Sequence, residues 1–494
     1  MEWRRWFISP VFVVIVILCG TVTLLDVCSS ENFVADLKTG YTDSVTYYYL
    51  LNVGFFSIVG YCLAACTGAV LYAADYEENS VYMRINRMGV NRYVISKVMQ
   101  TITGIILGIT TGTTVLIAIA TGAKDNRKVA STIGSSVWLF SIVGVLLTLV
   151  MVVFHGQIAE LMHTPAEAMA DTKSYILVCS TGILFIIGYN VVCGILRGLG
   201  DSKTPLYFVG LACVINIVLD FILVGYFHLG ATGAALATIT AQGGSFVISL
   251  WFLHGHGFHF EFTRKDIRLN KNLSKKIMVL GAPIALQDAL INISFLIITV
   301  IVNQMGVIAS ASLGVVEKII VFAMLPPMAI SSAVATMTAQ NYGAGLIQRM
   351  NKCLASGIGI ALVFGVSVCV YSQFLPETLT AFFSKDVAVV AMAAEYLRGY
   401  SIDCIIVSFV FCINSYFSGQ GNSLFPMIHS LIATFLFRIP LSYWFSQIDS
   451  SSLFLMGFAP PLSTVASLLI CIWYLRYNQK RMYSKGTAMP AISN

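Results

Sequence analysis

The stretch Gly198-Leu-Gly-Asp-Ser-Lys-Thr-Pro205 decides the fold of this chain, because the chain contains a second version of it, Gly419-Gln-Gly-Asn-Ser-Leu-Phe-Pro426. The shift that superimposes the two stretches also carries Gly122-Ala123 onto Gly343-Ala344 and Tyr175 onto Tyr396. Several landmarks at one spacing indicate an internal repeat. A repeat of this length in an apolar chain predicts two matched lobes.

The composition around this repeat is that of a membrane protein. The chain has 494 residues, of which 57% are hydrophobic and 11% are charged, and its mean hydropathy is +0.83. Soluble domains contain about 25% charged residues. The apolar runs are long enough to cross a bilayer as helices, and they lack the alternation of a membrane barrel. The fold class is therefore predicted to be all-α and integral to the lipid bilayer.

The apolar runs predict about twelve to thirteen transmembrane helices with short connections. The expected spans lie near residues 8–25, 46–73, 94–120, 134–155, 174–196, 205–227, 234–254, 277–303, 309–340, 353–373, 398–418, 425–446 and 453–476.

Lys and Arg residues are concentrated in alternate connections. The basic segments are 121–128, 197–203, 255–276, 349–352 and the tail from residue 476. Basic loops face the cytoplasm in multi-pass proteins. This pattern predicts a plasma-membrane protein with both termini in the cytoplasm.

One predicted span conflicts with this topology. Arg84, Arg87 and Arg92 precede the span 94–120, and the basic segment 121–128 follows it. A single crossing helix cannot place both ends in the cytoplasm. Either this segment is re-entrant or broken, or one of the two loops violates the charge rule.

The Gly-x-Gly turns of the repeat both lie in predicted cytoplasmic loops, so the two lobes share one orientation in the membrane. Their pseudo-two-fold axis then runs along the membrane normal. Two parallel lobes leave a cleft that rocking can expose to either side. This arrangement favours a transporter over a channel or a receptor. No βαβ unit surrounds the turns, so they are not nucleotide sites.

Four stretches of the chain resemble the multidrug and toxic compound extrusion family. They are Gly194–Pro205, Asn216–Asp220, Leu280–Gln287 and Gln340–Gly345. The resemblance runs from about residue 107 to about residue 480. It implies twelve helices in two six-helix lobes, a central cavity, and export of organic cations driven by H⁺ or Na⁺.

The first hundred residues resemble another family, the membrane subunits of ABC-type exporters, through Phe7–Pro10 and Tyr76–Gly89. This predicts a chimeric chain whose first lobe lacks the family's opening helices. The expected division is an atypical membrane segment (1–106), an incomplete N-terminal lobe (107–260), a C-terminal lobe (261–480) and a cytoplasmic tail (481–494).

Asp220 is the leading candidate for ion coupling, because an ionisable group inside a span is costly and usually functional. It follows Asn216 by one helical turn, so both side chains lie on one helix face. A carboxyl group withdrawn from water can bind a proton at neutral pH. The family resemblance implies a cation or proton site here, with Asn190 facing it. The alternatives are an Asp that meets water at a helix end and an ordinary interhelical hydrogen bond of Asn190.

The second lobe contains a further set of polar residues inside spans, for which we predict positions along the substrate cavity. These are Gln287, Asp288, Glu317, Lys318 and Asp403. Neighbouring residues of a helix point about 100° apart, so Glu317 and Lys318 cannot face the same point. Buried structural ion pairs are the alternative reading for this set.

These observations predict a monomeric secondary antiporter that exports small organic cations or drugs by alternating access. Two alternatives stay open: a lipid-linked oligosaccharide flippase of the same superfamily, and a chimeric membrane protein that transports nothing. No nucleotide loop, nucleophile elbow or metal set is present in the sequence, so we expect no enzyme activity, no cofactor and no metal. No basic face indicates nucleic-acid binding.

Overall fold

The computed structural model describes residues 107–161, 166–258, 260–449 and 452–484. Regular structure in this part of the chain is helical throughout. Nine of its helices are long and apolar enough to cross a membrane, or ten if a bent helix pair counts as one span. The all-helical membrane fold expected from composition is confirmed. The predicted spans 8–25 and 46–73 and the conflicting charges at 84–92 lie outside the described residues.

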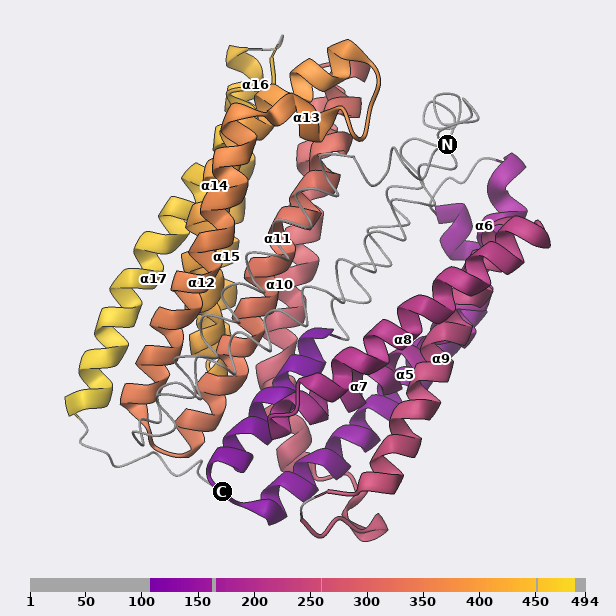
Figure 1. Ribbon diagram of the computed structural model, residues 1–494, viewed down its shortest axis with the longest axis vertical. Coiled ribbons are helices and arrows are strands. Elements are labelled where there is room, and N and C mark those ends of the chain that lie inside the picture. The colour runs from indigo at the N-terminus through magenta and orange to yellow at the C-terminus, as the bar shows by residue number, and fades with distance from the viewer. Residues whose placement is uncertain (1–106, 162–165, 259, 450–451, 485–494) are drawn as a thin grey trace, which may run out of the picture.

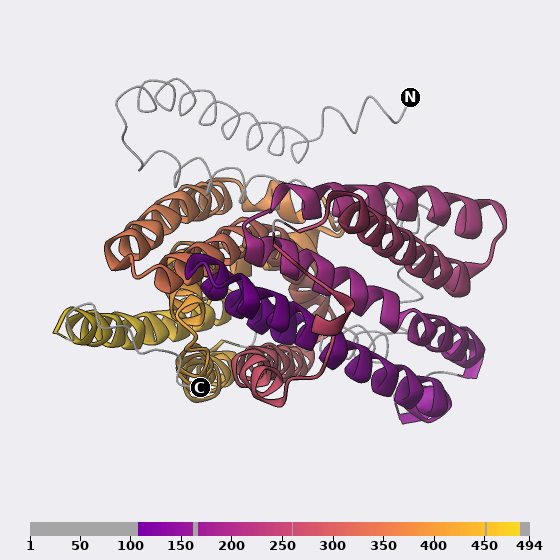
Figure 2. The same ribbon diagram turned by 90° about the horizontal axis from the view of Figure 1, so that it is seen from below.

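The described helices form two lobes, which Figure 1 shows touching at the lower end and separating toward the upper end. Figure 2 shows each lobe gathered on its own side. The first lobe consists of the helix Leu107–Gly122, α5 (Asn126–Leu161), α6 (Ala166–Thr181), α7 (Ile183–Leu199), α8 (Lys203–Asp220) with the π-helix η1 (Phe221–Tyr226), and α9 (Gly230–His256). The second consists of α10 (Lys271–Asn303), α11 (Val307–Gly343), α12 (Ile347–Phe374), the short α13 (Pro376–Thr380), α14 (Val387–Gly419), α15 (Leu424–Ile432), the π-helix η3 (Ala433–Arg438), α16 (Ile439–Ile448) and α17 (Ala459–Ser484).

The helix boundaries follow the repeat found in the sequence. Three helices of the first lobe start at positions that the repeat shift carries onto the first residues of helices in the second lobe. These pairs of first residues are Asn126 and Ile347, Ala166 and Val387, and Lys203 and Leu424. The two-lobe architecture with pseudo-two-fold symmetry is therefore present in the fold itself.

The Gly-x-Gly turns end one helix and start the next, as the repeat predicts. Gly200 and Gly421 have the left-handed φ angles of 98° and 84°, which favour glycine. Asp201 Oδ1 then accepts hydrogen bonds from the backbone N–H groups of Lys203 and Thr204, at 3.1 Å and 3.0 Å, and caps α8.

A second repeated turn contains a left-handed residue that is glycine in only one lobe. Lys124 has φ 57°, and Gly345, its counterpart in the repeat, has φ 76°. The backbone N–H groups of both residues donate to a carbonyl one turn earlier, Thr121 O and Tyr342 O. The first lobe therefore holds a lysine in a conformation that only glycine adopts without steric strain.

We expect Lys124→Gly to raise the free energy of unfolding by up to about 1 kcal/mol. Glycine removes the steric strain of the left-handed conformation, and this gain exceeds the cost of the greater conformational entropy that glycine has in the unfolded chain. The measurement is the apparent Tm of the purified full chain in detergent. Gly345→Ala is the matched control in the second lobe and should lower the apparent Tm. A lower Tm for Lys124→Gly would contradict this account of the turn.

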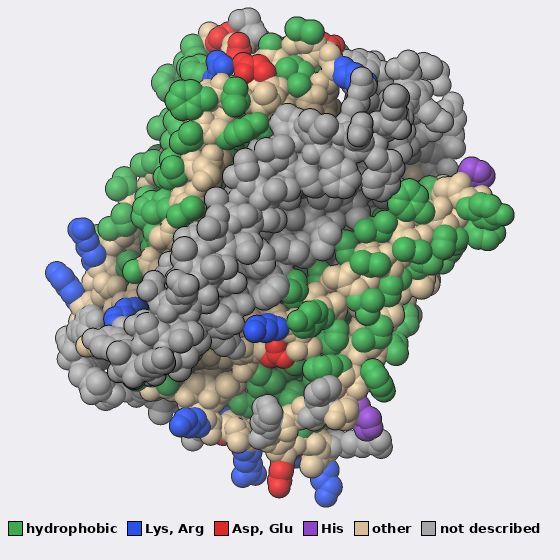
Figure 3. All heavy atoms as spheres, in the orientation of Figure 1, with side chains coloured by type: hydrophobic (Ala, Val, Ile, Leu, Met, Phe, Trp, Pro, Cys, Tyr) green, Lys and Arg blue, Asp and Glu red, His purple; other side chains and the backbone are tan. Residues whose placement is uncertain are grey.

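Large apolar side chains are exposed along the outside of both lobes. Val145, Leu149 and Val153 project from α5, and Val363, Val366 and Val370 from α12. In Figure 3 hydrophobic side chains cover the visible flanks, and several Lys and Arg side chains project from the lower edge. Such surfaces are stable only against lipid, so the protein is a multi-pass membrane protein.

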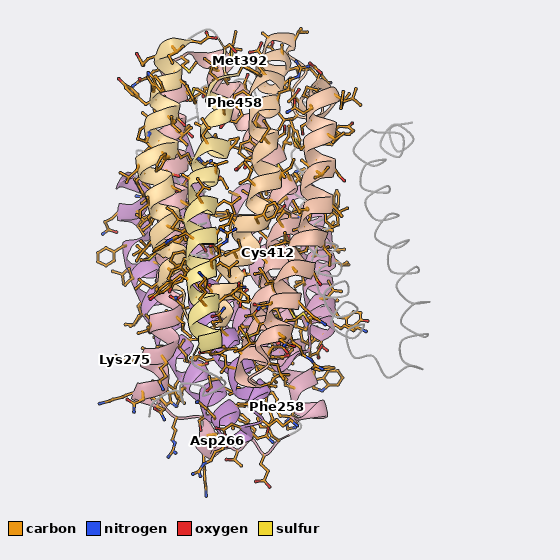
Figure 4. All side chains as sticks on the ribbon, turned by 90° about the vertical axis from the view of Figure 1, so that its left-hand side faces the viewer. Phe258, Asp266, Lys275, Met392, Cys412 and Phe458 are labelled. Atoms are coloured by element: carbon orange, nitrogen blue, oxygen red, sulfur yellow. The ribbon has the colours of Figure 1, made fainter. Side chains whose placement is uncertain are left out.

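The linker that joins the lobes, between the end of α9 at His256 and the start of α10 at Lys271, contacts the first lobe. Trp138 Nε1 on α5 donates to Ile267 O at 2.9 Å, and the stacked rings of Phe258 and Phe260 pack against the core. Figure 4 places Phe258, Asp266 and Lys275 at the lower end of the bundle, and Met392 and Phe458 at the upper end. These are called the linker end and the far end.

Within the linker, Asp266 closes a tight turn. Its Oδ2 accepts hydrogen bonds from the backbone N–H and the hydroxyl of Thr263, both at 2.8 Å. These bonds hold the pKa of the Asp266 carboxyl below its usual value. The linker is thus an ordered part of the first lobe up to Asn270, whose side chain caps α10.

Candidate functional site

Asp220 ends α8 at the point where the backbone changes to the π-helix η1, a distortion that is frequent at functional sites. Its side chain is 6% exposed. Within the described residues, no hydrogen-bond partner meets Asp220 Oδ1 or the buried Nδ2 of Asn216, one turn earlier. Buried polar groups are normally hydrogen-bonded. One helix face therefore carries a buried acceptor, Asp220 Oδ1, and a buried donor, Asn216 Nδ2, without partners among the described residues.

Two further residues of the first lobe bear on this site. Tyr175 on α6 lies within electrostatic range of Asp220. The amide of Asn190 on α7 donates to Ile186 O of its own helix at 2.8 Å. This bond lies within one helix, so it is not the interhelical bond considered as the alternative for Asn190. The joint role of Asn190, Asn216 and Asp220 stays a prediction.

The second lobe also buries a carboxylate. Asp403 on α14 is 5% exposed, and its Oδ1, like that of Asp220, has no hydrogen-bond partner among the described residues. Arg438 at the end of η3 interacts with it electrostatically, and its guanidinium lies 4.3 Å from the ring centroid of Phe295. Asp403 therefore has a cationic neighbour inside the lobe.

Three other predicted cavity residues interact with different parts of the second lobe. Gln287 Nε2 donates to Ser430 Oγ on α15 at 3.2 Å. Lys318 Nζ lies 5.9 Å from the Phe383 ring centroid, whereas Glu317 lies within electrostatic range of Tyr396 on α14. The two neighbours on α11 thus face different partners, as their separation of about 100° predicts.

Asp288 on α10 is half-buried, and its backbone oxygen accepts from Asn292 Nδ2 at 3.0 Å. Its role in the cavity stays a prediction, as do the roles of the other four residues of this set.

The sequence interpretation missed two ionisable residues, Arg438 and His429. Both fall inside the predicted span 425–446, so the rule that ionisable groups in spans are functional could have found them. His429 is buried, with Nε2 2.7 Å from Asn414 Oδ1 and Nδ1 2.9 Å from Ser467 Oγ. This network joins α14, α15 and α17.

The buried carboxylates of the two lobes do not occupy positions that the repeat relates to each other. Asp220 corresponds to Leu441, and Asp403 corresponds to Gly182. Gly182 marks a 47° bend between Thr172–Thr181 and Ile183–Leu199, where α14 of the second lobe continues unbroken. The lobes share a backbone plan but place their ionisable groups differently. Within the described residues, no three His, Cys, Asp or Glu side chains are arranged to hold a metal ion.

A model of the MatE family matches residues 92–222 and 283–444. The Bacillus subtilis "Probable multidrug resistance protein YoeA" is 26% identical over 391 residues, covering 76% of this chain and 82% of that protein. "Probable multidrug resistance protein YpnP" of the same organism is 29% identical over 354 residues, covering 72% and 79%. The "Multidrug export protein MepA" of Staphylococcus aureus is 25% identical over 306 residues, covering 61% and 67%.

The fold is also that of solved structures. A crystal structure of MATE in complex with MaL6 matches with a TM-score of 0.79 and 19% identity, over 89% of this chain and 97% of that one. A structure described as the outward-facing conformation of a multidrug resistance MATE family transporter matches with a TM-score of 0.79 and 19% identity, over 90% and 97%. The resemblance of residues 1–106 to ABC-type exporters lies outside the described residues and stays a prediction.

Proposed function

The chain belongs to the MatE family, and on this premise we propose that it is a secondary active antiporter that exports organic cations or drugs. The exchanged ion is H⁺ or Na⁺. The proposed coupling of ion binding to transport rests on one observation. Asp220 Oδ1 and Asn216 Nδ2 are buried on one helix face without a hydrogen-bond partner among the described residues. A proton or small cation that binds there removes the cost of a desolvated carboxylate.

Alternating access follows from the two-lobe form. The lobes meet at the linker end and separate toward the far end (Figure 1). Lys275, in the first turns of α10, lies at the linker end (Figure 4), which we assign to the cytoplasm. The chain would then be closed to the cytoplasm, in line with its likeness to a structure described as outward-facing.

A lipid-linked oligosaccharide flippase would need a strongly basic cavity. Two cations of the described second lobe, Lys318 and Arg438, lie against aromatic rings, and Arg438 also interacts with Asp403. These contacts leave less free positive charge for a pyrophosphate group. We therefore favour cationic substrates for this protein.

The test is export by the intact chain. Cells that lack their own efflux pumps would express the full-length protein, and retention of a cationic dye would be compared with retention of an anionic dye. We expect lower retention of the cationic dye only, and loss of this difference when the H⁺ and Na⁺ gradients are collapsed. Absence of export from membrane-inserted protein would favour the inactive-chimera alternative.

A further inference from the structure

Two glycines related by the repeat lie at the linker end, where helices of the two lobes contact each other. Gly122 ends the helix Leu107–Gly122, and Gly343 ends α11. A Cβ atom on Gly122 would overlap the backbone oxygen of Gln340, and one on Gly343 would overlap the backbone oxygen of Ile119. The repeat shift that carries Gly122 onto Gly343 also carries Ile119 onto Gln340. The contact is therefore reciprocal, like an isologous dimer interface within one chain.

Further close contacts join the same elements. Gly112 meets the backbone of α10, where a Cβ would lie 2.8 Å from Gly281 N and 2.8 Å from Ile277 O. Gln340 Nε2 on α11 donates to Gly198 O on α7, across the lobes, at 3.2 Å. Buried residues of both lobes, such as Ile119 and Leu280, share one apolar cluster there. The linker end is thus closed mainly by backbone packed directly on backbone.

This closure leaves no room for a side chain to adjust. A clash with a rotamer-rich side chain is relieved by rotation, but the atoms opposite Gly122 and Gly343 belong to the backbones of continuous helices. A methyl group at either position can be accommodated only if the two helices move apart. Because the helices belong to different lobes, that movement opens the linker end.

We propose that Gly122 and Gly343 are positioning residues of the transport cycle, which allow the two lobes to close at the linker end. The inference rests on the proposed alternating-access function, but it concerns conformation and not ion coupling. The closed contact forms in the state described here, and the lobes separate at these glycines when the linker end opens.

The test is hydrogen exchange of the purified full chain in lipid nanodiscs, measured by mass spectrometry. Gly343→Ala should exchange about tenfold faster than wild type in peptides covering 117–125 and 338–346, because overpacking of this kind shifts an equilibrium by about one order of magnitude. Gly122→Ala should give the same shift by symmetry. Gln340→Ala, which adds no atoms, should give a smaller increase.

The matched control is Gly314→Ala on α11, where a Cβ would meet nothing within 4 Å. Its exchange should equal that of wild type. Equal exchange in Gly343→Ala and Gly314→Ala overturns the proposal. Faster exchange across all helices of Gly343→Ala and Gly122→Ala, without enrichment at the two peptides, also overturns it by indicating general destabilisation.

Hydrogen exchange requires no transport activity, so the two proposals fail separately. If the intact chain exports no dye and the faster hydrogen exchange is still observed, the antiporter proposal is refuted and the proposal for the two glycines is retained. If the chain exports a dye and Gly343→Ala leaves exchange and export unchanged, only the proposal for the two glycines is refuted.

Discussion

Asp220→Asn is expected to abolish dye export while leaving the protein folded in the membrane. Asparagine has nearly the shape of a protonated aspartate but can neither release a proton nor attract a cation by charge. Asp220 is buried, and its Oδ1 lacks a hydrogen-bond partner among the described residues, so removal of the negative charge costs no observed ion pair there. Export should therefore fall to the level of cells without the protein.

The measurement is dye retention in cells that lack efflux pumps, normalised to the amount of protein in the membrane. The control is Asp201→Asn, since Asp201 lies on the loop just before the same helix and an asparagine can still cap α8. This variant should export like wild type. Unchanged export by Asp220→Asn would refute coupling at this site, even if the chain is a transporter.

The second large effect is expected from Arg438→Leu, which should lower the free energy of unfolding by about 2 kcal/mol, because the buried Asp403 would lose a nearby positive charge and Phe295 would lose its cation–π partner. Asp403 is 5% exposed, and its Oδ1 has no hydrogen-bond partner among the described residues.

A double-mutant cycle measures this coupling. Unfolding midpoints in detergent would be compared for Arg438→Leu, Asp403→Asn and the double variant. The double variant should be less destabilised than the sum of the single ones by at least about 1 kcal/mol, because neighbours in one network are not additive. Strict additivity would show that Arg438 and Asp403 do not stabilise each other.

The positions of the helices were predictable from the sequence. The predicted span 205–227 corresponds to the helical stretch Lys203–Tyr226, and 425–446 corresponds to Leu424–Ile448. Spans are set by the thickness of the bilayer and by the charges that flank them, and both quantities are read along the chain. The repeat also predicted that Gly200 and Gly421 would occupy equivalent turns.

The candidate sites were only partly predictable. Asn216 and Asp220 are one turn apart on one helix, so their shared face follows from helical geometry alone. Arg438 could not be paired with Asp403 in this way, because α14 and η3 are brought together only by packing. For the same reason the partners of Gln287, Glu317 and Lys318 could not be read from the sequence, and their predicted positions along the cavity stay a prediction.

The sequence by itself determined that this protein is a membrane bundle of two repeated lobes with family-like motifs. Length, hydropathy and repeat spacing are local quantities, and the bilayer leaves a helix as almost the only solution for each apolar run. Only the tertiary structure decided that Asp403 has a cationic neighbour, that Asp220 Oδ1 has no partner among the described residues, and that Gly122 and Gly343 meet their opposite backbones. Those properties depend on distances between residues that are far apart in the chain, and these distances are set by how whole helices pack.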